Sequence, residues 1–212
     1  PMTISIEGQV RDESGQVISG RASVLAHPAN VYVGLRTDRY FGREGQPLDV
    51  DLIAVAPDSK PLPGQKIDVK VVEIRWERVP VEGQFGQYNW QRQEIEVESG
   101  QVIAAGDGTA RYTFTPPGAG IYRVQALARD DYERLNSATL QVWVTGTRPV
   151  WWGRPSNTID LIADKESYQP GDTAEILIPT PFTGTSYALI AVERAGIQAY
   201  EVVKIEGSTF VY

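Results

Sequence analysis

The chain has 212 residues, no cysteine, a single histidine and a formal net charge of −7. A domain typically holds roughly 100–200 residues, so this length allows one large domain or two small ones. The acidic balance argues against a nucleic-acid partner, which needs a basic surface that follows phosphates. The absence of cysteine excludes disulfides, thiolate metal sites, a cysteine nucleophile and a cysteine-based thioester within these residues.

No uninterrupted apolar run approaches the roughly 20 residues that span a bilayer, and no amphipathic helix indicates insertion into a membrane. Residues 1–4 lack the basic region and apolar stretch of a signal peptide. If the protein is exported, we expect its signal to lie outside this stretch of sequence.

Alternation of apolar and polar residues predicts β-strands along most of the chain. The first clear run covers residues 48–54. In residues 67–76 the apolar set changes from odd to even positions after Val71, which predicts a β-bulge. Further alternating runs cover residues 111–115, 122–129, 138–145 and 188–192. Turn signals at residues 61–64, 106–108 and 116–118 separate these runs.

Short strands at this spacing predict an all-β fold. We expect tandem antiparallel Greek-key β-sandwiches with an immunoglobulin-like or fibronectin type III-like architecture, and nothing resembles a βαβ unit.

Internal repetition divides the chain further. A shift of about 126 residues places Val33 on Ile159 and Gly45 on Gly171, and it brings the pair Asp38-Arg39 onto Asp164-Lys165. A shift of about 118 residues places residues 4–26 on residues 122–144. In this second alignment Arg11-Asp12 falls on Arg129-Asp130.

The two alignments predict four segments. Residues 1–27 read as the terminal hairpin of a preceding module, and residues 28–147 as one complete module. Residues 148–156 form a linker, and residues 157–212 read as the first half of a further module. By the larger shift residues 159–212 correspond to residues 33–86, so the two end pieces together lack only the equivalent of residues 87–121.

Three stretches carry a family resemblance. Residues 164–174, with the sequence DKESYQPGDTA, resemble a recurrent element of macroglobulin-like domains in the alpha-2-macroglobulin family. Residues 179–182 and 188–197 look like its bacterial branch. The resemblance is good over residues 157–205 and weaker over residues 28–147, where the element is reduced to residues 40–45 without its proline.

The resemblance implies an array of macroglobulin-like domains that traps proteases, as part of bacterial defence. In that family a bait segment is cut, the molecule rearranges, and a reactive thioester can capture the protease. The thioester needs a cysteine near a glutamine, so it does not lie in this chain, and no stretch looks like a bait segment. The resemblance therefore implies a non-catalytic scaffold fragment, periplasmic or extracellular, with a membrane tether known among bacterial relatives.

Side chains that could carry chemistry are few. His27 ends a predicted strand without a second ligand nearby, so a junction residue is the simpler interpretation. Ser59-Lys60 lies in a proline-flanked loop that offers no oxyanion hole. Carboxylates gather in three places, which are the predicted strand face with Glu94, Glu96 and Glu98, the strand with Asp49 and Asp51, and the predicted hairpin turn with Asp130, Asp131 and Glu133. Solvated strand faces and a turn explain them without calcium or acid–base chemistry.

Aromatic residues provide the strongest local candidate for binding. Residues 83–90 mix aromatic, amide and glycine residues, a composition that can bind sugars or peptides by stacking. The simpler interpretation is a long hairpin loop. We expect Trp143, Trp151 and Trp152 to pack where two modules meet.

The sequence thus predicts no catalytic, cofactor-binding or metal-binding residue, no cofactor, no nucleic-acid partner and no membrane insertion within the fragment. The expected partners are neighbouring macroglobulin-like domains and, through the full-length protein, target proteases. The two incomplete ends also predict strand exchange between identical chains or one poorly ordered end. The competing outcome is a hairpin that folds back on residues 28–147 of its own chain. The alternative function is a surface adhesin or carbohydrate-binding β-sandwich module of a secreted protein, and a third is an accessory domain of a secreted enzyme. Flanking sequence with a Cys–Gln motif would favour the inhibitor, whereas further copies with cell-wall anchoring signals would favour the adhesin.

Overall fold

The computed structural model describes residues 1–80, 87–152 and 158–212. In these ranges the chain forms β-strands joined by turns and contains no helix, so none is available to cross a bilayer. The prediction of an all-β protein built from antiparallel sheets is confirmed.

The middle of the chain forms a sandwich of two sheets, which we call the central sandwich (residues 32–145). The smaller sheet consists of β3 (Tyr32–Arg36), β5 (Leu48–Val55) and β8 (Thr109–Phe114), in that order. The larger consists of β4 (Phe41–Arg43), β6 (Lys66–Pro80), β7 (Tyr88–Ile103), β9 (Gly120–Arg129) and β10 (Leu135–Thr145). Its spatial order is β4-β10-β9-β6-β7. One pair departs from the antiparallel prediction, because β4 runs parallel to β10 from Phe41 to Arg43.

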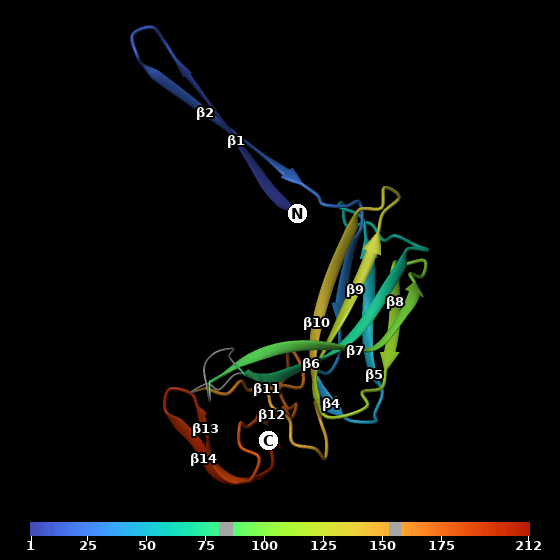
Figure 1. Ribbon diagram of the computed structural model, residues 1–212, viewed down its shortest axis with the longest axis vertical. Coiled ribbons are helices and arrows are strands. Elements are labelled where there is room, and N and C mark those ends of the chain that lie inside the picture. The colour runs from blue at the N-terminus through green and yellow to red at the C-terminus, as the bar shows by residue number, and fades with distance from the viewer. Residues whose placement is uncertain (81–86, 153–157) are drawn as a thin grey trace.

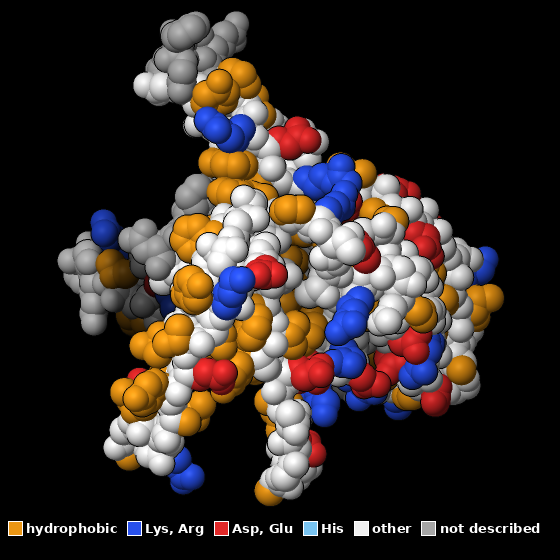
Figure 2. Space-filling model, turned by 90° about the horizontal axis from the view of Figure 1, so that it is seen from below, with side chains coloured by type: hydrophobic (Ala, Val, Ile, Leu, Met, Phe, Trp, Pro, Cys, Tyr) orange, Lys and Arg blue, Asp and Glu red, His pale blue; other side chains and the backbone are white. Residues whose placement is uncertain are grey.

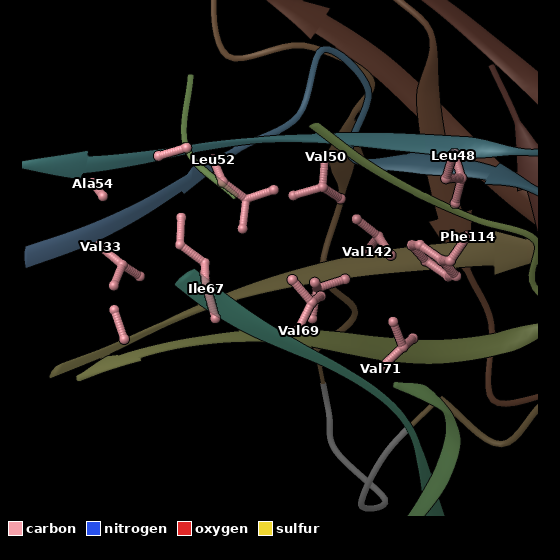
Figure 3. Close-up of a cluster of buried hydrophobic side chains, with 14 of the residues drawn as sticks. Val33, Leu48, Val50, Leu52, Ala54, Ile67, Val69, Val71, Phe114 and Val142 are labelled. Carbon is pink, nitrogen blue, oxygen red and sulfur yellow. The ribbon is translucent and has the colours of Figure 1, made fainter. Parts of the chain in front are cut away.

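The core of the central sandwich lies between the two sheets. Val50 and Leu52 of β5 point toward Ile67 and Val69 of β6, and all four are almost completely buried (Figure 3). Each buried side chain of this size contributes roughly 1.5–3 kcal/mol relative to an exposed position. The alternation in the sequence is therefore the one-sided burial pattern of two facing sheets.

A β-bulge is present beside Val71 as predicted, but its extra residue lies on the partner strand β7 and not in the run 67–76. Val71 lies opposite Glu98, whereas Val72 lies opposite Glu96, so β7 carries Val97 as its extra residue. Val71 and Val72 are both buried although they are consecutive, and β6 pairs with β9 past them without a change of register. Beyond the bulge, β6 and β7 continue as a long two-stranded arm.

The N-terminal hairpin, β1 (Met2–Arg11) and β2 (Val17–Ala26), projects from one end of the central sandwich (Figure 1). Every residue from 1 to 25 is exposed. The two strands pair with each other in a sheet of their own. The hairpin therefore has the regular form of a sheet without a core beneath it.

The C-terminal strands lie at the opposite end of the central sandwich (Figure 1). They are β11 (Ile162–Ala163), β12 (Ile176–Pro179), β13 (Thr185–Glu193), β14 (Ile197–Glu206) and β15 (Thr209–Val211). One sheet has the order β11-β12-β15 and the other pairs β13 with β14; we call them the C-terminal sheets. Ile178, Val203 and Ile205 are buried between them. Figure 2 views the molecule from this end and shows hydrophobic side chains exposed among charged ones.

The two repeats in the sequence reappear as equal strand registers. Ile6 lies opposite Ala22 in the N-terminal hairpin, and adding 118 to both numbers gives Val124 and Leu140, which are partners in β9 and β10. Adding 126 to the partners Arg36 and Asp51 of β3 and β5 gives Ile162 and Leu177, which are partners in β11 and β12.

The larger shift does not continue to the end of the chain. β15 pairs with β12 as β8 pairs with β5, although far fewer residues separate β12 from β15. The expectation that residues 159–212 correspond to residues 33–86 is therefore wrong after β12. A tight turn between β13 and β14 replaces the long β6–β7 arm, so the counterpart of β8 is reached sooner.

Candidate functional site: the joint

The side chains considered for chemistry belong to different elements of the chain, and His27, Lys60 and the carboxylates of β5 and β7 have local structural contacts. The Nδ1 atom of His27 is 2.9 Å from the hydroxyl of Tyr32, at the start of the central sandwich. Ser59 occupies a turn with a φ of 67°, and Lys60 pairs with Asp58. No group of three or more possible metal-ligating residues occurs in the parts of the chain that the structure describes.

The carboxylates of β7 do not converge. Glu94 pairs with Arg123 and Glu96 with Lys70, in both cases with a strand of the same sheet. Glu98 instead accepts a hydrogen bond of 2.6 Å from Tyr112 of the smaller sheet. The prediction that the three carboxylates share one face is thus wrong for Glu98, because the bulge at Val97 changes the direction of the side chains that follow it.

Two further carboxylates of β5 lie on the outer face of the smaller sheet. Asp51 pairs with Arg36 and Arg111, and these two hydrogen bonds lower the pKa of its carboxyl below the ordinary value. Asp49 accepts a hydrogen bond of 2.6 Å from the hydroxyl of Thr113. Cross-strand pairs of this kind stabilise a sheet, which gives both carboxylates a structural role.

The predicted turn at Asp130 is formed by its own hydrogen bonds. The Oδ1 atom of Asp130 accepts from the backbone N–H groups of Tyr132 and Arg134, and Oδ2 accepts from that of Asn30. Burial acts to raise the pKa of Asp130, but these bonds and the Arg134 side chain outweigh it and hold the pKa below its ordinary value. The carboxylate of Asp130 therefore stabilises this turn.

An assembly of charged and aromatic side chains joins the central sandwich to the C-terminal sheets. We call it the joint. Its members are Arg39, Tyr40, Phe41, Glu44, Glu73, Trp90, Trp143, residues 146–152, Ile162, Asp164, Glu175, Leu177 and Ser208.

The joint has an apolar centre. Phe41 of β4, Ile162 of β11 and Leu177 of β12 are buried against one another, with Tyr40 and Trp143 packed around them. These residues come from both sides of the boundary between the central sandwich and the C-terminal sheets. Burial of this kind gains roughly 25 cal/mol per Å² of apolar surface.

Polar contacts surround the apolar centre. The backbone N–H of Tyr40 donates to the carbonyl of Asp164 over 2.9 Å, while the carbonyl of Tyr40 accepts from Trp143. The guanidinium of Arg39 pairs with Glu175 and lies 4.0 Å from the carboxylate of Asp164. The bond between Tyr40 and Asp164 and the pair Arg39–Glu175 cross the boundary and are directional, which apolar contacts are not.

Asp164 is the buried acid of the joint. Its Oδ1 atom accepts hydrogen bonds from the hydroxyl of Tyr168 and the backbone N–H of Glu175. Burial acts to raise the pKa of Asp164, and these hydrogen bonds, together with Lys165 and Arg39, outweigh it and leave the pKa below its ordinary value. The anionic carboxylate therefore holds the β11–β12 connection against Arg39.

The chain that leaves β10 is fastened to the central sandwich. The Oε1 atom of Glu44 accepts from both the N–H and the hydroxyl of Thr147, and Oε2 accepts from the N–H of Ala119. Gly146 leaves room for this carboxylate, because a Cβ atom there would lie 2.3 Å from it. The hydrogen bonds from Thr147 lower the pKa of Glu44.

Arg148 continues this attachment. Its guanidinium donates to Glu73 over 2.9 Å and to the carbonyl of Ala119 over 3.0 Å. The carboxylate of Glu73 is almost completely buried and also pairs with Arg75 at 2.7 Å. A buried carboxylate needs such partners, since leaving one unpaired is costly.

The same segment is fastened to the C-terminal sheets. The N–H of Val150 donates to the Ser208 hydroxyl, and the indole N–H of Trp152 donates to the carbonyl of Ser208 over 2.7 Å. Trp151 stacks on Trp90 of β7, with ring centroids 4.7 Å apart and an angle of 4° between the planes. Residues 146–152 are thus bound on both sides of the joint.

The tryptophans lie where the sequence places them, at the meeting point of two parts of the chain. Of the aromatic stretch at residues 83–90, positions 83–86 lie outside the described residues, while Tyr88 and Trp90 belong to β7. Arg39, Glu44, Glu73 and Ser208 were not identified from sequence. The one sequence feature that pointed to the joint was the repeated acidic–basic pair at residues 38–39 and 164–165. Arg39 and Asp164, one from each pair, meet across the joint.

The family model described as bacterial macroglobulin domain 6 matches residues 35–144, which is more than half of the chain, and the chain belongs to that family. The resemblance to the alpha-2-macroglobulin family is confirmed.

Two curated relatives match almost the whole chain. An alpha-2-macroglobulin homolog of Nostoc sp. is 26% identical over 209 residues, covering 98% of this chain and 11% of the relative. An alpha-2-macroglobulin homolog of Deinococcus radiodurans is 25% identical over 213 residues, covering 99% of this chain and 20% of the relative. The chain therefore spans between a tenth and a fifth of the length of these two relatives.

Solved structures of similar proteins include Escherichia coli alpha-2-macroglobulin in its native conformation. It is 17% identical with a TM-score of 0.47, and the match covers 99% of this chain and 14% of that protein. Salmonella alpha-2-macroglobulin reacted with methylamine is 16% identical with a TM-score of 0.46, at the same coverage.

Proposed function

We propose that the chain is a non-catalytic scaffold segment of an exported bacterial alpha-2-macroglobulin-like protease inhibitor, periplasmic or extracellular. The segment carries neither the thioester nor the bait segment of such a protein. Membership of the bacterial macroglobulin domain 6 family supports the proposal, as does the name alpha-2-macroglobulin shared by the curated relatives.

The joint is the observation that carries the scaffold role. Its ionised side chains contact one another across the boundary between the central sandwich and the C-terminal sheets, as Arg39 does with Glu175. A catalytic group would instead need a position within reach of a reacting atom. Charged groups arranged in this way fix the orientation of neighbouring modules.

The four-segment division is part of this proposal, with residues 1–27, 28–147, 148–156 and 157–212 as its segments. The equal registers of the N-terminal hairpin and β9–β10 support the first segment as the last hairpin of a module. The equal registers of β3–β5 and β11–β12 support the last segment as the beginning of another. The contacts of residues 146–152 with both the central sandwich and the C-terminal sheets support the described part of the linker as a fixed connection.

A protease assay tests the functional proposal. The 212-residue chain, in micromolar excess, is incubated with trypsin-like, elastase-like and metallo-proteases, and cleavage of a protein substrate is followed. We expect cleavage rates unchanged from those with a matched inert protein. Inhibition of any of the three classes by this chain alone would show that it carries an inhibitory element of its own.

A further inference from the structure

Two tryptophans that are adjacent in the sequence differ in their hydrogen bonding within the joint. The indole N–H of Trp152 donates to the carbonyl of Ser208 over 2.7 Å. The indole nitrogen of Trp151 is buried, and no described residue provides a hydrogen-bond acceptor for it. A buried donor of this kind loses its hydrogen bonds to water and gains none in return. The position that Trp151 occupies is therefore destabilised by its own N–H group.

A ring contact holds Trp151 in this position. Its indole stacks on that of Trp90, with ring centroids 4.7 Å apart. Trp90 belongs to the arm, by which we mean residues 75–80 of β6 and 88–93 of β7, and the arm extends from the central sandwich toward the C-terminal sheets (Figure 1). Beyond the area that it buries, an aromatic pair gains about as much as an unsatisfied buried donor costs. The stack is therefore only weakly favourable.

Residues 146–152, which we call the strap, are not packed tightly on β6. A hollow of about 310 Å³ is bounded by both, with Arg75, Trp76 and Glu77 of β6 and residues 148–151 of the strap in its lining. Close packing is what makes a protein interior resist rearrangement. A segment that borders a hollow can leave its position without opening a hydrophobic core.

The two parts of the strap are attached to different bodies. Residues 147–148 are hydrogen-bonded to Glu44 and Glu73 of the central sandwich. Residues 150–152 are hydrogen-bonded to Ser208 of the C-terminal sheets, and the stack connects them to the arm. Pro149 stands between the two groups. If the stack opens, residues 150–152 therefore move with the C-terminal sheets, and the chain bends near Pro149.

We infer that the stack of Trp90 on Trp151 is a reversible latch between the arm and the strap. The closed latch holds the C-terminal sheets beside the arm in the orientation that the structure shows. When the latch opens, the indole N–H of Trp151 gains hydrogen bonds to water, and the C-terminal sheets rotate about the apolar centre of the joint. Because the two states differ little in free energy, the open one is a minor population of the free chain.

The distance between two spin labels distinguishes the two states. The chain has no cysteine, so Gln91→Cys in the arm and Glu201→Cys in β14 attach labels at two exposed positions. We expect one main distance and a minor second one. Trp90→Ala removes the stack and should make the second distance the main one, whereas the control Tyr88→Ala, on the same arm, should leave the distribution unchanged. An unchanged distribution in Trp90→Ala, or an equal shift in the control, would overturn the inference.

A matched pair of variants tests the role of the unsatisfied N–H group. Trp151→Phe and Trp152→Phe make the same chemical change, but the first removes a donor without an acceptor and the second removes the hydrogen bond to Ser208. Trp151→Phe keeps a ring that can stack on Trp90 and should favour the closed state, whereas Trp152→Phe should favour the open one.

The ratio of open to closed chains should be at least about tenfold lower in Trp151→Phe than in Trp152→Phe. An equal or higher ratio in Trp151→Phe would overturn the inference. Neither result changes the outcome expected in the protease assay, so the inference and the proposed function fail separately.

Discussion

The N-terminal hairpin and the C-terminal sheets are attached to the same central sandwich in opposite ways. The hairpin is followed by a short connection and has every residue from 1 to 25 exposed. The C-terminal sheets share with the sandwich an apolar cluster, the backbone hydrogen bond from Tyr40 to Asp164 and the Arg39–Glu175 ion pair. Regular strand pairing is common to both ends, so pairing by itself does not fasten a sheet to its neighbour; buried side chains and cross-boundary hydrogen bonds do.

A cavity in the joint should weaken the attachment of the C-terminal sheets most and so reduce the difference between the two ends. Leu177→Ala removes a completely buried side chain from the cluster with Phe41 and Ile162. A buried leucine-to-alanine change costs about 2–5 kcal/mol. We expect calorimetry to show the C-terminal sheets unfolding before the central sandwich, in place of a shared transition.

The matched control is Ile6→Ala in the N-terminal hairpin, measured at high dilution. This side chain is already exposed, so its loss should change stability by less than about 0.5 kcal/mol. Equal effects of the two substitutions would mean that the joint contributes no more to stability than the free hairpin.

The second prediction concerns the ionic side of the joint. Arg148→Ala removes the hydrogen bonds to Glu73 and Ala119 and leaves Glu73 with Arg75. The expected loss is about 1–2 kcal/mol, since one partner of a buried acid disappears while another stays. Chemical denaturation measures it. Arg92→Ala, which breaks an exposed pair with Glu94, should cost less than about 1 kcal/mol. A loss for Arg148→Ala no larger than that of this control would refute the structural role.

The sequence predicts much of the fold and little of the joint, for a physical reason. Period-two alternation records which face of a strand is buried, so the strands around Val50 and the bulge at Val71 can be predicted from it. The joint depends on contacts between residues more than a hundred positions apart, such as Arg39 with Glu175. The residues around a charged side chain in the sequence do not show which distant residue it will pair with. The repeat could be recognised in the sequence because charged pairs and a glycine recur. The alignment by 126 residues no longer holds after β12, because the connection between β13 and β14 is shorter than the β6–β7 arm.

The smallest expected effect concerns two equivalent turns, one at Asp12 in the N-terminal hairpin and one at Asp130 in the central sandwich. Asp130 and Asp12 both accept turn hydrogen bonds, yet only Asp130 also binds the backbone N–H of Asn30, which fixes the incoming chain to the central sandwich. Asp130→Asn should lower the melting temperature of the sandwich at neutral pH, because the anionic acceptor is lost. Asp12→Asn should leave that temperature unchanged, since the N-terminal hairpin touches nothing that the sandwich buries.

The difference in melting temperature between wild type and Asp130→Asn should depend on pH, and the pKa of Asp130 gives the direction of that dependence. The pKa of Asp130 is lower in the folded chain than its ordinary value, so its contribution to stability is present above the unfolded-state pKa of about 3.9 and is lost as the pH falls toward the lower folded-state value. The difference in melting temperature between wild type and Asp130→Asn should therefore shrink as the medium is acidified below that pH. A difference that stayed constant down to the acid-unfolding limit would mean that the charge of Asp130 is not what holds the turn to Asn30.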